Sequence, residues 1–266
     1  MLYLPEKLCW YNEMITGMIP IEICIECDTL VTLRESVRSA FVGGASRIEL
    51  CRDMAMDGLT PSREDIEAAR EIFIRPGVMA MIRPRAGDFY YTSSEIKKMQ
   101  QHIDMAASAG ADGVVFGALN RNRKVDIKNL GILIDTARSK NLSVTFHRAF
   151  DAVSQPLPAL HTLIDLGVDR ILTSGIPWGH SGTALDGKSR LQEIIAEAAD
   201  RIEIIIAGGV SPHNAGEIVT QLSKPFGRIS LHAYSGVRKK GLTDIGLVQQ
   251  LVSVVGQYAD PPPLAF

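Results

Sequence analysis

The stretch "PIEICIE" at residues 20–26 alternates apolar and polar side chains with a period of two. In an extended strand, its isoleucines share one face, and the other face carries Glu22, Cys24 and Glu26. The isoleucine face must pack against apolar groups, so the charged face has to lie where other polar groups can pair with it. This pattern is typical of a barrel strand whose outer face is covered by helices. It predicts a barrel with a polar interior.

Seven further apolar segments follow, separated by longer amphipathic stretches such as "SEIKKMQQHIDMAASAG". The eight predicted strands cover residues 20–26, 47–51, 78–83, 112–116, 142–147, 169–173, 202–207 and 228–232. Eight strand–helix alternations in 266 residues favour a single-domain α/β fold, the (β/α)8 TIM barrel, over a doubly wound sheet. The predicted organisation is an N-terminal extension at 1–17, the barrel at 18–258 and a proline-rich tail at 259–266.

The composition is that of an ordinary globular protein, with 46% hydrophobic and 22% charged residues and a net charge of −2. This charge gives no basic surface for nucleic acid. The N-terminus lacks the pattern of a signal peptide, and no apolar run is long enough to span a membrane. Four scattered cysteines do not form a disulfide framework. We therefore expect a cytoplasmic protein that binds neither nucleic acid nor membranes.

Polar side chains collect at the predicted carboxyl ends of the strands, which is where TIM barrels carry their functional groups. "VTFHRAFD" at 144–151 is the clearest case, because a buried strand ends there in His147, Arg148 and Asp151. A histidine near carboxylates suits proton transfer, so the acid–base candidates are Glu49, His147 and Asp151. The candidates for binding a ligand or anion are Glu26, Arg83, Arg85, Asp88, Arg148, Gly208, Gly209 and His232.

Two of the arginines and the two glycines among these candidates could also have a purely structural role. The arginines of "MIRPRAGDFYY" (81–91) suit a carboxylate or phosphate, but they could equally neutralise Glu26, Glu49 or Asp88 in an internal ion network. The glycine pair of "IIIAGGV" (204–210) lets a ligand approach the backbone, and a tight strand-to-helix turn needs glycine as well.

Cys24 and Cys51 are predicted to point into the barrel from neighbouring strands, which lie about 4.8 Å apart. They could be small apolar fillers, a disulfide, or a pair of soft ligands for Cu(I). Cys9 and Cys27 have no comparable surroundings, and we assign them no role. In particular, Cys24-x-x-Cys27 lies along a strand, so its two side chains point to opposite faces.

Two helix starts can be predicted from capping residues. Ser62 is the expected N-cap of a helix in "LTPSRED" (59–65), with Asp65 completing a capping box. Ser211 is the expected N-cap of a helix in "GVSPHNAGEI" (209–218), with Pro212 at its first position.

Several motifs, in order along residues 20–235, resemble those of the CutC family of copper homeostasis proteins. They are "IEICIE", "GGASRIELC", "DGLTPS", "MIRPRAGDFYY", "GADGVVFGAL", "VTFHRAFD", "RILTSG" and "IAGGV". The resemblance implies a cytoplasmic TIM barrel that forms a homodimer or a larger homo-oligomer. It also implies copper handling, with Cys24 and Cys51 at the positions of the family's proposed copper-binding cysteines. The loop "SGIPWGHSGTALDG" (174–187) is longer than is usual in the family.

The sequence therefore leaves three functional hypotheses. In the first, Cys24 and Cys51 hold copper as Cu(I), and the protein serves copper homeostasis. In the second, the polar mouth is the active site of an enzyme that acts on a small phosphorylated or carboxylated metabolite, gripped by Arg83 and Arg85. In the third, the charges form an ion network that only stabilises the barrel.

Overall fold

A computed structural model describes residues 18–222 and 228–258. Eight parallel strands close into a barrel in the order of the sequence, and β1 (Ile21–Glu26) pairs with β8 (Ile229–Ala233) to complete it. Between them lie β2 (Arg47–Cys51), β3 (Val78–Met81), β4 (Gly113–Phe116), β5 (Ser143–Phe146), β6 (Arg170–Thr173) and β7 (Glu203–Ile206). The predicted (β/α)8 TIM barrel is confirmed. The largest difference among the strand ends is at β3, which was predicted to reach residue 83 and ends at Met81.

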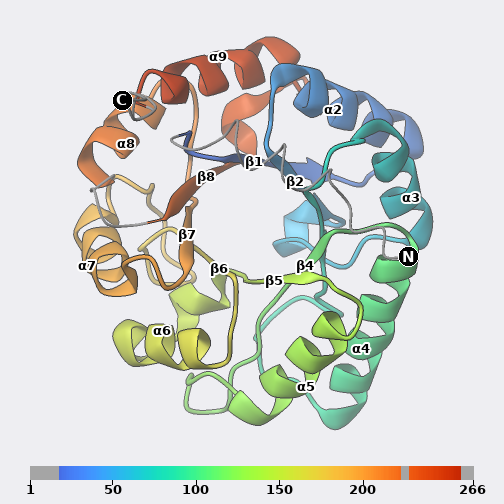
Figure 1. Cartoon of the computed structure of the whole chain (residues 1–266), viewed down its shortest axis with the longest axis vertical. Coiled ribbons are helices and arrows are strands. Elements are labelled where there is room, and N and C mark those ends of the chain that lie inside the picture. The colour runs from blue at the N-terminus through green and yellow to red at the C-terminus, as the bar shows by residue number, and fades with distance from the viewer. Residues whose placement is uncertain (1–17, 223–227, 259–266) are drawn as a thin grey trace, which may run out of the picture.

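The helices form a ring outside the barrel, as Figure 1 shows. They are α2 (Leu30–Gly43), α3 (Arg63–Ile72), α4 (Ser93–Ser108), α5 (Ile127–Arg138), α6 (Pro156–Asp165), α7 (Lys188–Ala198), α8 (Ala215–Leu222) and α9 (Ile245–Gly256). Short 3-10 helices follow three strands: η1 (Met54–Met56), η2 (Arg148–Ala152) and η3 (Ser235–Val237). A small hairpin, β9 (Arg238–Lys239) and β10 (Leu242–Thr243), connects η3 to α9.

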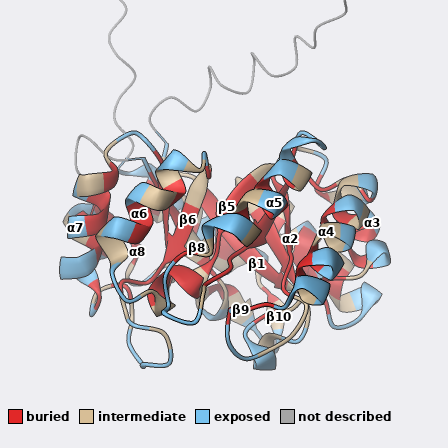
Figure 2. Ribbon diagram, turned by 90° about the horizontal axis from the view of Figure 1, so that it is seen from below, coloured by how far each residue is buried: buried red, intermediate tan, exposed pale blue. Residues whose placement is uncertain are grey.

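The main hydrophobic core lies between the strands and the helices. The isoleucines of β1 belong to it, together with Val144 and Phe146 of β5, and all of them are buried. Figure 2 shows the buried strands in the middle and the exposed outer faces of the helices around them. The alternation of side chains in β1 thus has the predicted direction, with isoleucines outward and Glu22 and Cys24 inside the barrel.

The two capping predictions have different outcomes. Ser62 caps α3, and its hydroxyl and the Asp65 carboxylate form the predicted capping box. The prediction for Ser211 is wrong, because α8 begins at Ala215. Residues 212–214 form a turn in which the Ser211 backbone N–H and hydroxyl both donate to the side-chain oxygen of Asn214. Because the Ser211 hydroxyl binds the Asn214 side chain, it does not cap the helix, and the helix begins only at Ala215.

The predicted extension at 1–17 and the predicted tail at 259–266 lie outside the described residues. In the ranges that the structure covers, none of the helices combines the length and the apolar character needed to cross a membrane.

Candidate functional site

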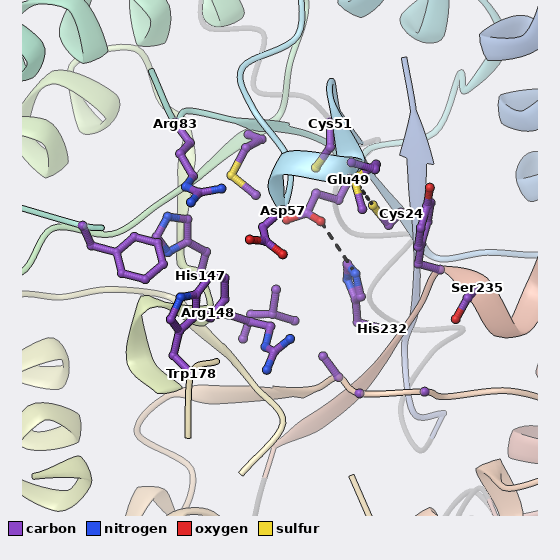
Figure 3. A pocket seen from close by; sticks show the side chains of 18 residues that line it. Cys24, Glu49, Cys51, Asp57, Arg83, His147, Arg148, Trp178, His232 and Ser235 are labelled. Carbon is purple, nitrogen blue, oxygen red and sulfur yellow. Dashed lines mark hydrogen bonds and ion pairs between the residues drawn. The ribbon is translucent and has the colours of Figure 1, made fainter. Parts of the chain in front are cut away.

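The carboxyl ends of the strands surround a cavity of about 330 Å³ (Figure 3). This is the low end of the range found for small-molecule sites. The cavity gathers residues from most of the barrel strands. Nine of the predicted site residues line it: Cys24, Glu49, Cys51, Arg83, His147, Arg148, Gly208, Gly209 and His232.

Cys24, Glu49 and His232 form one compact group on one wall of the cavity. Cys24 of β1 is the direct cross-strand partner of Glu49 on β2, and β8 supplies His232 from the other side of β1. The sulfur, a carboxylate oxygen and an imidazole nitrogen all lie within 4.8 Å of one another, and all three residues are buried. This separation is small enough for one metal ion to contact all three atoms.

Glu22 orients the imidazole of this group. His232 Nδ1 donates to Glu22 Oε1 at 2.9 Å, so its Nε2 faces Glu49 Oε2 at 3.7 Å. Burial by itself would raise the pKa of Glu22, but hydrogen bonding to His232 and the charge of Arg47 lower that pKa to about 2. Burial opposes the charged form of His232, yet its bonds to Cys24 and Glu22 raise the pKa of the imidazole well above its usual value. A carboxylate that fixes the ring in this way is common around metal-binding histidines.

The two cavity thiols differ in protonation. A hydrogen bond from Cys51 is the main cause that lowers the pKa of Cys24 to about 6, against the effect of burial, with His232 adding to it. The same bond and burial raise the pKa of Cys51 well above its usual value. Burial also raises the pKa of Glu49 to about 8. At neutral pH the group thus holds one thiolate, and only thiolates bind metals strongly.

Further sulfur atoms surround Cys24. Cys24 Sγ lies 3.9 Å from the thioether of Met54, and Cys51, Met79 and Met81 pack in the same small cluster inside the barrel. Met54 was not predicted, because it lies in η1 beyond the end of β2, where the alternation of the strand no longer says which way a side chain points. A cluster of thiol and thioether sulfur provides soft ligands.

Arg83 lies on another wall of the cavity and is only 2% exposed. Its terminal nitrogens donate to the backbone carbonyls of Met56 at 2.7 Å, Gly58 at 3.3 Å and Gly87 at 3.0 Å. These carbonyls hold the guanidinium in place without neutralising it, and Arg83 forms no ion pair with any described residue. It is a rigid, buried positive charge.

His147 lies beside Arg83, as Figure 3 shows. Its Nδ1 accepts a hydrogen bond from the Ala149 N–H at 3.1 Å, and its ring centroid is 5.0 Å from that of Phe89. Burial, and then the charge of Arg83, lower the pKa of His147 to about 3, so the ring is neutral. Because Nδ1 accepts, the single proton lies on Nε2, which is buried and has no hydrogen-bond partner among the residues that the structure describes.

Arg148 also faces the cavity, and Asp151 holds it there. Arg148 Nε donates to Asp151 at 2.8 Å, and its guanidinium lies 5.4 Å from the centre of the Trp178 ring. Asp151 additionally accepts hydrogen bonds from Thr173 and Ser174 on the neighbouring strand end. Both carboxylate oxygens of Asp151 thus accept hydrogen bonds, and Asp151 positions Arg148 without lining the cavity itself.

The other predicted site residues do not line this cavity. Arg85 binds Asp88 at 2.9 Å and Glu95 at 2.5 Å on the outer surface. This arginine therefore pairs with carboxylates of the protein itself, which was the alternative to binding an anion. Glu26 accepts hydrogen bonds from Tyr234 and Arg238, both at 2.8 Å, and so ties the end of β1 to the small hairpin. Asp88 and Asp151 instead line a second, neighbouring pocket.

Trp178 lines the cavity and was also not predicted. It comes from the long loop at 174–187, whose backbone is anchored where the Trp178 N–H donates to the Asp151 carbonyl at 2.9 Å. Its ring packs against Phe89 with the centroids 5.0 Å apart. The unusual length of this loop was the one signal that it contributes to the mouth.

A closed (β/α)8 barrel, with a cavity at the carboxyl ends of its strands that is lined in part by buried charged side chains, defines this molecule as a TIM-barrel protein with a candidate site in the usual position. A sequence model described as the CutC family matches residues 19–236. The chain belongs to the CutC family.

Relatives in several bacteria support this membership. A family protein CutC from Vibrio vulnificus (strain CMCP6) is 43% identical over 198 residues, which cover 74% of this chain and 75% of the relative. One from Glaesserella parasuis serovar 5 (strain SH0165) is 41% identical over 205 residues, covering 77% of this chain and 79% of the relative.

Solved structures include one CutC protein and more distant proteins with the same fold. A CutC protein of Streptococcus agalactiae, provisionally assigned to copper homeostasis, matches with a TM-score of 0.69 and 30% identity over 81% of this chain and 98% of its own. A thiamine phosphate pyrophosphorylase from Pyrococcus furiosus matches with a TM-score of 0.60 and 16% identity over 92% of this chain and 98% of its own, and shares the fold alone.

Proposed function

We propose that this chain binds copper as Cu(I) at the Cys24 side of the cavity and serves copper homeostasis. The observation that carries the proposal is the grouping of Cys24, Glu49 and His232 within 4.8 Å, with further sulfur atoms around Cys24. The membership of the CutC family and the assignment of the Streptococcus agalactiae relative agree with it.

The donor set favours a soft ion. The Cys24 thiolate, the His232 imidazole and the thioether of Met54 suit Cu(I), and Cys51 can add a second thiolate if the incoming ion displaces its proton. Glu49 is a hard ligand and is protonated at neutral pH, so we expect it to contribute least. Cys24, Cys51 and Glu49 are buried and the His232 side chain is only 10% exposed, which limits the contact of water with the ion.

An anaerobic titration of Cu(I) against the chromophoric chelator bicinchoninate tests the proposal. Wild-type protein should remove one equivalent of Cu(I) from the chelator, Cys24→Ser should remove none, and Cys51→Ser should bind more weakly. The matched control is Cys27→Ser, because Cys27 is equally buried but packs among the helix-facing residues of the main core.

Two outcomes would contradict the copper site. One is equal Cu(I) binding by Cys24→Ser and Cys27→Ser. The other is tighter binding of Zn(II) than of Cu(I) in a competition, since a thiolate, an imidazole and a carboxylate also suit zinc.

We further propose that the protein works in the cytoplasm. The three cysteines that the structure describes are all free thiols, as a reducing compartment would keep them. The homo-oligomer implied by the family stays a prediction, which light scattering coupled to size-exclusion chromatography can check.

A further inference from the structure

The cavity extends well beyond the metal-sized cluster. At about 330 Å³ it has room for a small organic molecule as well as an ion. Figure 3 shows Arg83, His147 and Arg148 on the side of the cavity away from Cys24 and His232. None of these three residues belongs to the Cys24–Glu49–His232 group.

Arg83 is the first reason to expect an anion there. A guanidinium that is 2% exposed and forms no ion pair with a described residue leaves a positive charge inside the protein. An isolated buried charge is costly, and buried arginines are normally paired with a carboxylate or a phosphate. Because three backbone carbonyls already fix the orientation of Arg83, a ligand that supplied the missing negative charge would meet a preorganised partner.

His147 is the second, independent reason. Its Nε2–H is a buried donor for which residues 18–222 and 228–258 provide no acceptor, while the Ala149 N–H fixes the other nitrogen as an acceptor. Buried donors in native proteins almost always have a partner, and a ligand oxygen would provide it here. The ring cannot become a second cation to repel Arg83, because its pKa is about 3.

The remaining walls of this half suit the rest of an organic molecule. Phe89 and Trp178 pack together as an apolar wall, and Arg148 adds a second guanidinium whose charge Asp151 balances. Gly208 and Gly209 have φ angles of 104° and 69° and line the cavity with no side chain of their own. The charged groups that face the centre from the other walls are Asp57, which lies at the exposed rim, and the Cys24–His232 pair.

We propose that the half of the cavity lined by Arg83, His147 and Arg148 binds the carboxylate or phosphate group of a small organic anion. The anion lies with its charged end at Arg83 and the His147 Nε2–H. Its organic part lies along Phe89 and Trp178 and reaches toward the cluster around Cys24. This site does not depend on copper binding, and it can be tested in metal-free protein.

Thermal unfolding of the metal-free protein tests the proposal with three matched probes: glycerol 3-phosphate, glycerate and neutral glycerol. At concentrations about tenfold above Kd, a specific anion should raise Tm by about 3 °C or more. Glycerol should not shift Tm. A shift with glycerol 3-phosphate alone identifies a phosphate site, and a shift with glycerate alone identifies a carboxylate site.

Two arginines that are two residues apart give the matched variants. Arg83→Met should abolish the shift, whereas Arg85→Met should keep it, because Arg85 pairs with Asp88 and Glu95 outside the cavity. If Arg83→Met fails to fold, Arg148→Met replaces it, since that side chain is 35% exposed and its loss should weaken the shift. The proposal is overturned if neither anion shifts the wild type, or if the cavity variant and Arg85→Met respond alike.

Failure here would leave the copper proposal intact, because the probes are measured without metal. Conversely, Cys24→Ser should still respond to the anion if only the copper site is lost. Cys24→Ser therefore tests the copper proposal and Arg83→Met tests the anion proposal, so the failure of one can be told from the failure of the other.

Discussion

Cys24 and Cys51 are identical thiols on neighbouring strands, yet the site gives them opposite protonation. Their interaction lowers the pKa of Cys24 and raises the pKa of Cys51, so negative charge is favoured on the sulfur next to His232. A single thiolate beside an imidazolium is a pair whose net charge is zero, which lowers the cost of burying either group. The arrangement favours one deprotonated sulfur at neutral pH, which the proposed Cu(I) site requires.

The pH dependence of stability should reveal the burial of His147. Its pKa is about 3 in the folded protein and about 6.5 in the unfolded chain. Between these values the unfolded chain binds the additional proton, so the free energy of unfolding falls as pH decreases from about 6.5. The contribution is at most about 1.4 kcal/mol per pH unit. His147→Gln should remove it, and urea unfolding between pH 7 and pH 4.5 measures the difference in slope.

The control for this experiment is His161→Gln, which changes an exposed histidine on α6 that contacts Glu197. The free energy of unfolding of this variant should change with pH as that of the wild type does. If His147→Gln loses stability with acid as steeply as the wild type does, the ring is not held neutral in the folded protein.

Arg83 and Arg85 mark the limit of prediction for single residues. They share a motif and a face by simple alternation, so the sequence gives no reason to separate them. In the structure, Pro84 and the turn after it leave Arg83 under the loops of β2 and β3, while Arg85 reaches Asp88 and Glu95 at the start of α4. The partners that decide their roles come from loops, where no periodic pattern applies.

At the scale of elements, the strands were predictable and the loops at the mouth were not. A barrel strand that alternates apolar and polar side chains can turn only its apolar face toward the helices. The inward direction of Cys24, Glu49 and Cys51 could therefore be predicted from the sequence. His232 follows from the same alternation on β8. Met54 in η1 and Trp178 in the long loop do not, because turns and loops place side chains by tertiary contacts alone.

Gly117, directly after β4, makes room for His147. A Cβ atom at this position would lie 2.7 Å from His147 Nδ1 and 2.9 Å from the Ala149 Cβ. Gly117→Ala should therefore push the imidazole out of place and cost about 1–3 kcal/mol of unfolding free energy. It should also weaken any anion effect on Tm, because the Nε2–H would no longer point at the same place.

The matched substitution is Gly131→Ala in α5, where an added Cβ meets nothing within 4 Å. It should stabilise the protein by about 0.4–1 kcal/mol, since alanine favours the helix over glycine. Chemical denaturation of both variants gives the comparison. Equal effects of the two substitutions would show that His147 does not pack tightly against the end of β4.

At the scale of the whole molecule, the barrel interior contains a balanced ion network below the cavity. Arg47 of β2 contacts Glu22 of β1 at 3.1 Å and Glu203 of β7 at 2.7 Å. Arg170 of β6 adds a second positive charge, which donates to Thr145 and Ser143 of β5. Arg47 thus joins β2 to β1 and β7, and Arg170 joins β6 to β5. This part of the molecule agrees with the structural hypothesis for the interior charges.

The network and the proposed copper site share Glu22, whose Oε2 accepts from Arg47 while its Oε1 accepts from His232. The stability of the barrel and the orientation of the imidazole therefore depend on the same carboxylate. The positive charge of Arg83, in contrast, is not paired with a carboxylate of any described residue. This difference separates a structural buried charge from one that is available to a ligand.

Arg47→Met should be among the most destabilising single changes, because it leaves Glu203 buried without its ion-pair partner and takes one of two cationic partners from Glu22, which keeps His232. Loss of one partner from a buried pair costs about 3–5 kcal/mol, which lowers Tm by roughly 6–20 °C in a chain of this size. Arg63→Met is the control, since Arg63 and Glu67 form an exposed pair on α3, worth about 0.5 kcal/mol or less. The double variant Arg47→Met/Glu203→Gln should regain part of the lost Tm, because it removes the carboxylate that Arg47→Met leaves without an ion pair. Differential scanning calorimetry can rank the four proteins, and equal Tm values for Arg47→Met and Arg63→Met would refute a network that holds the barrel together.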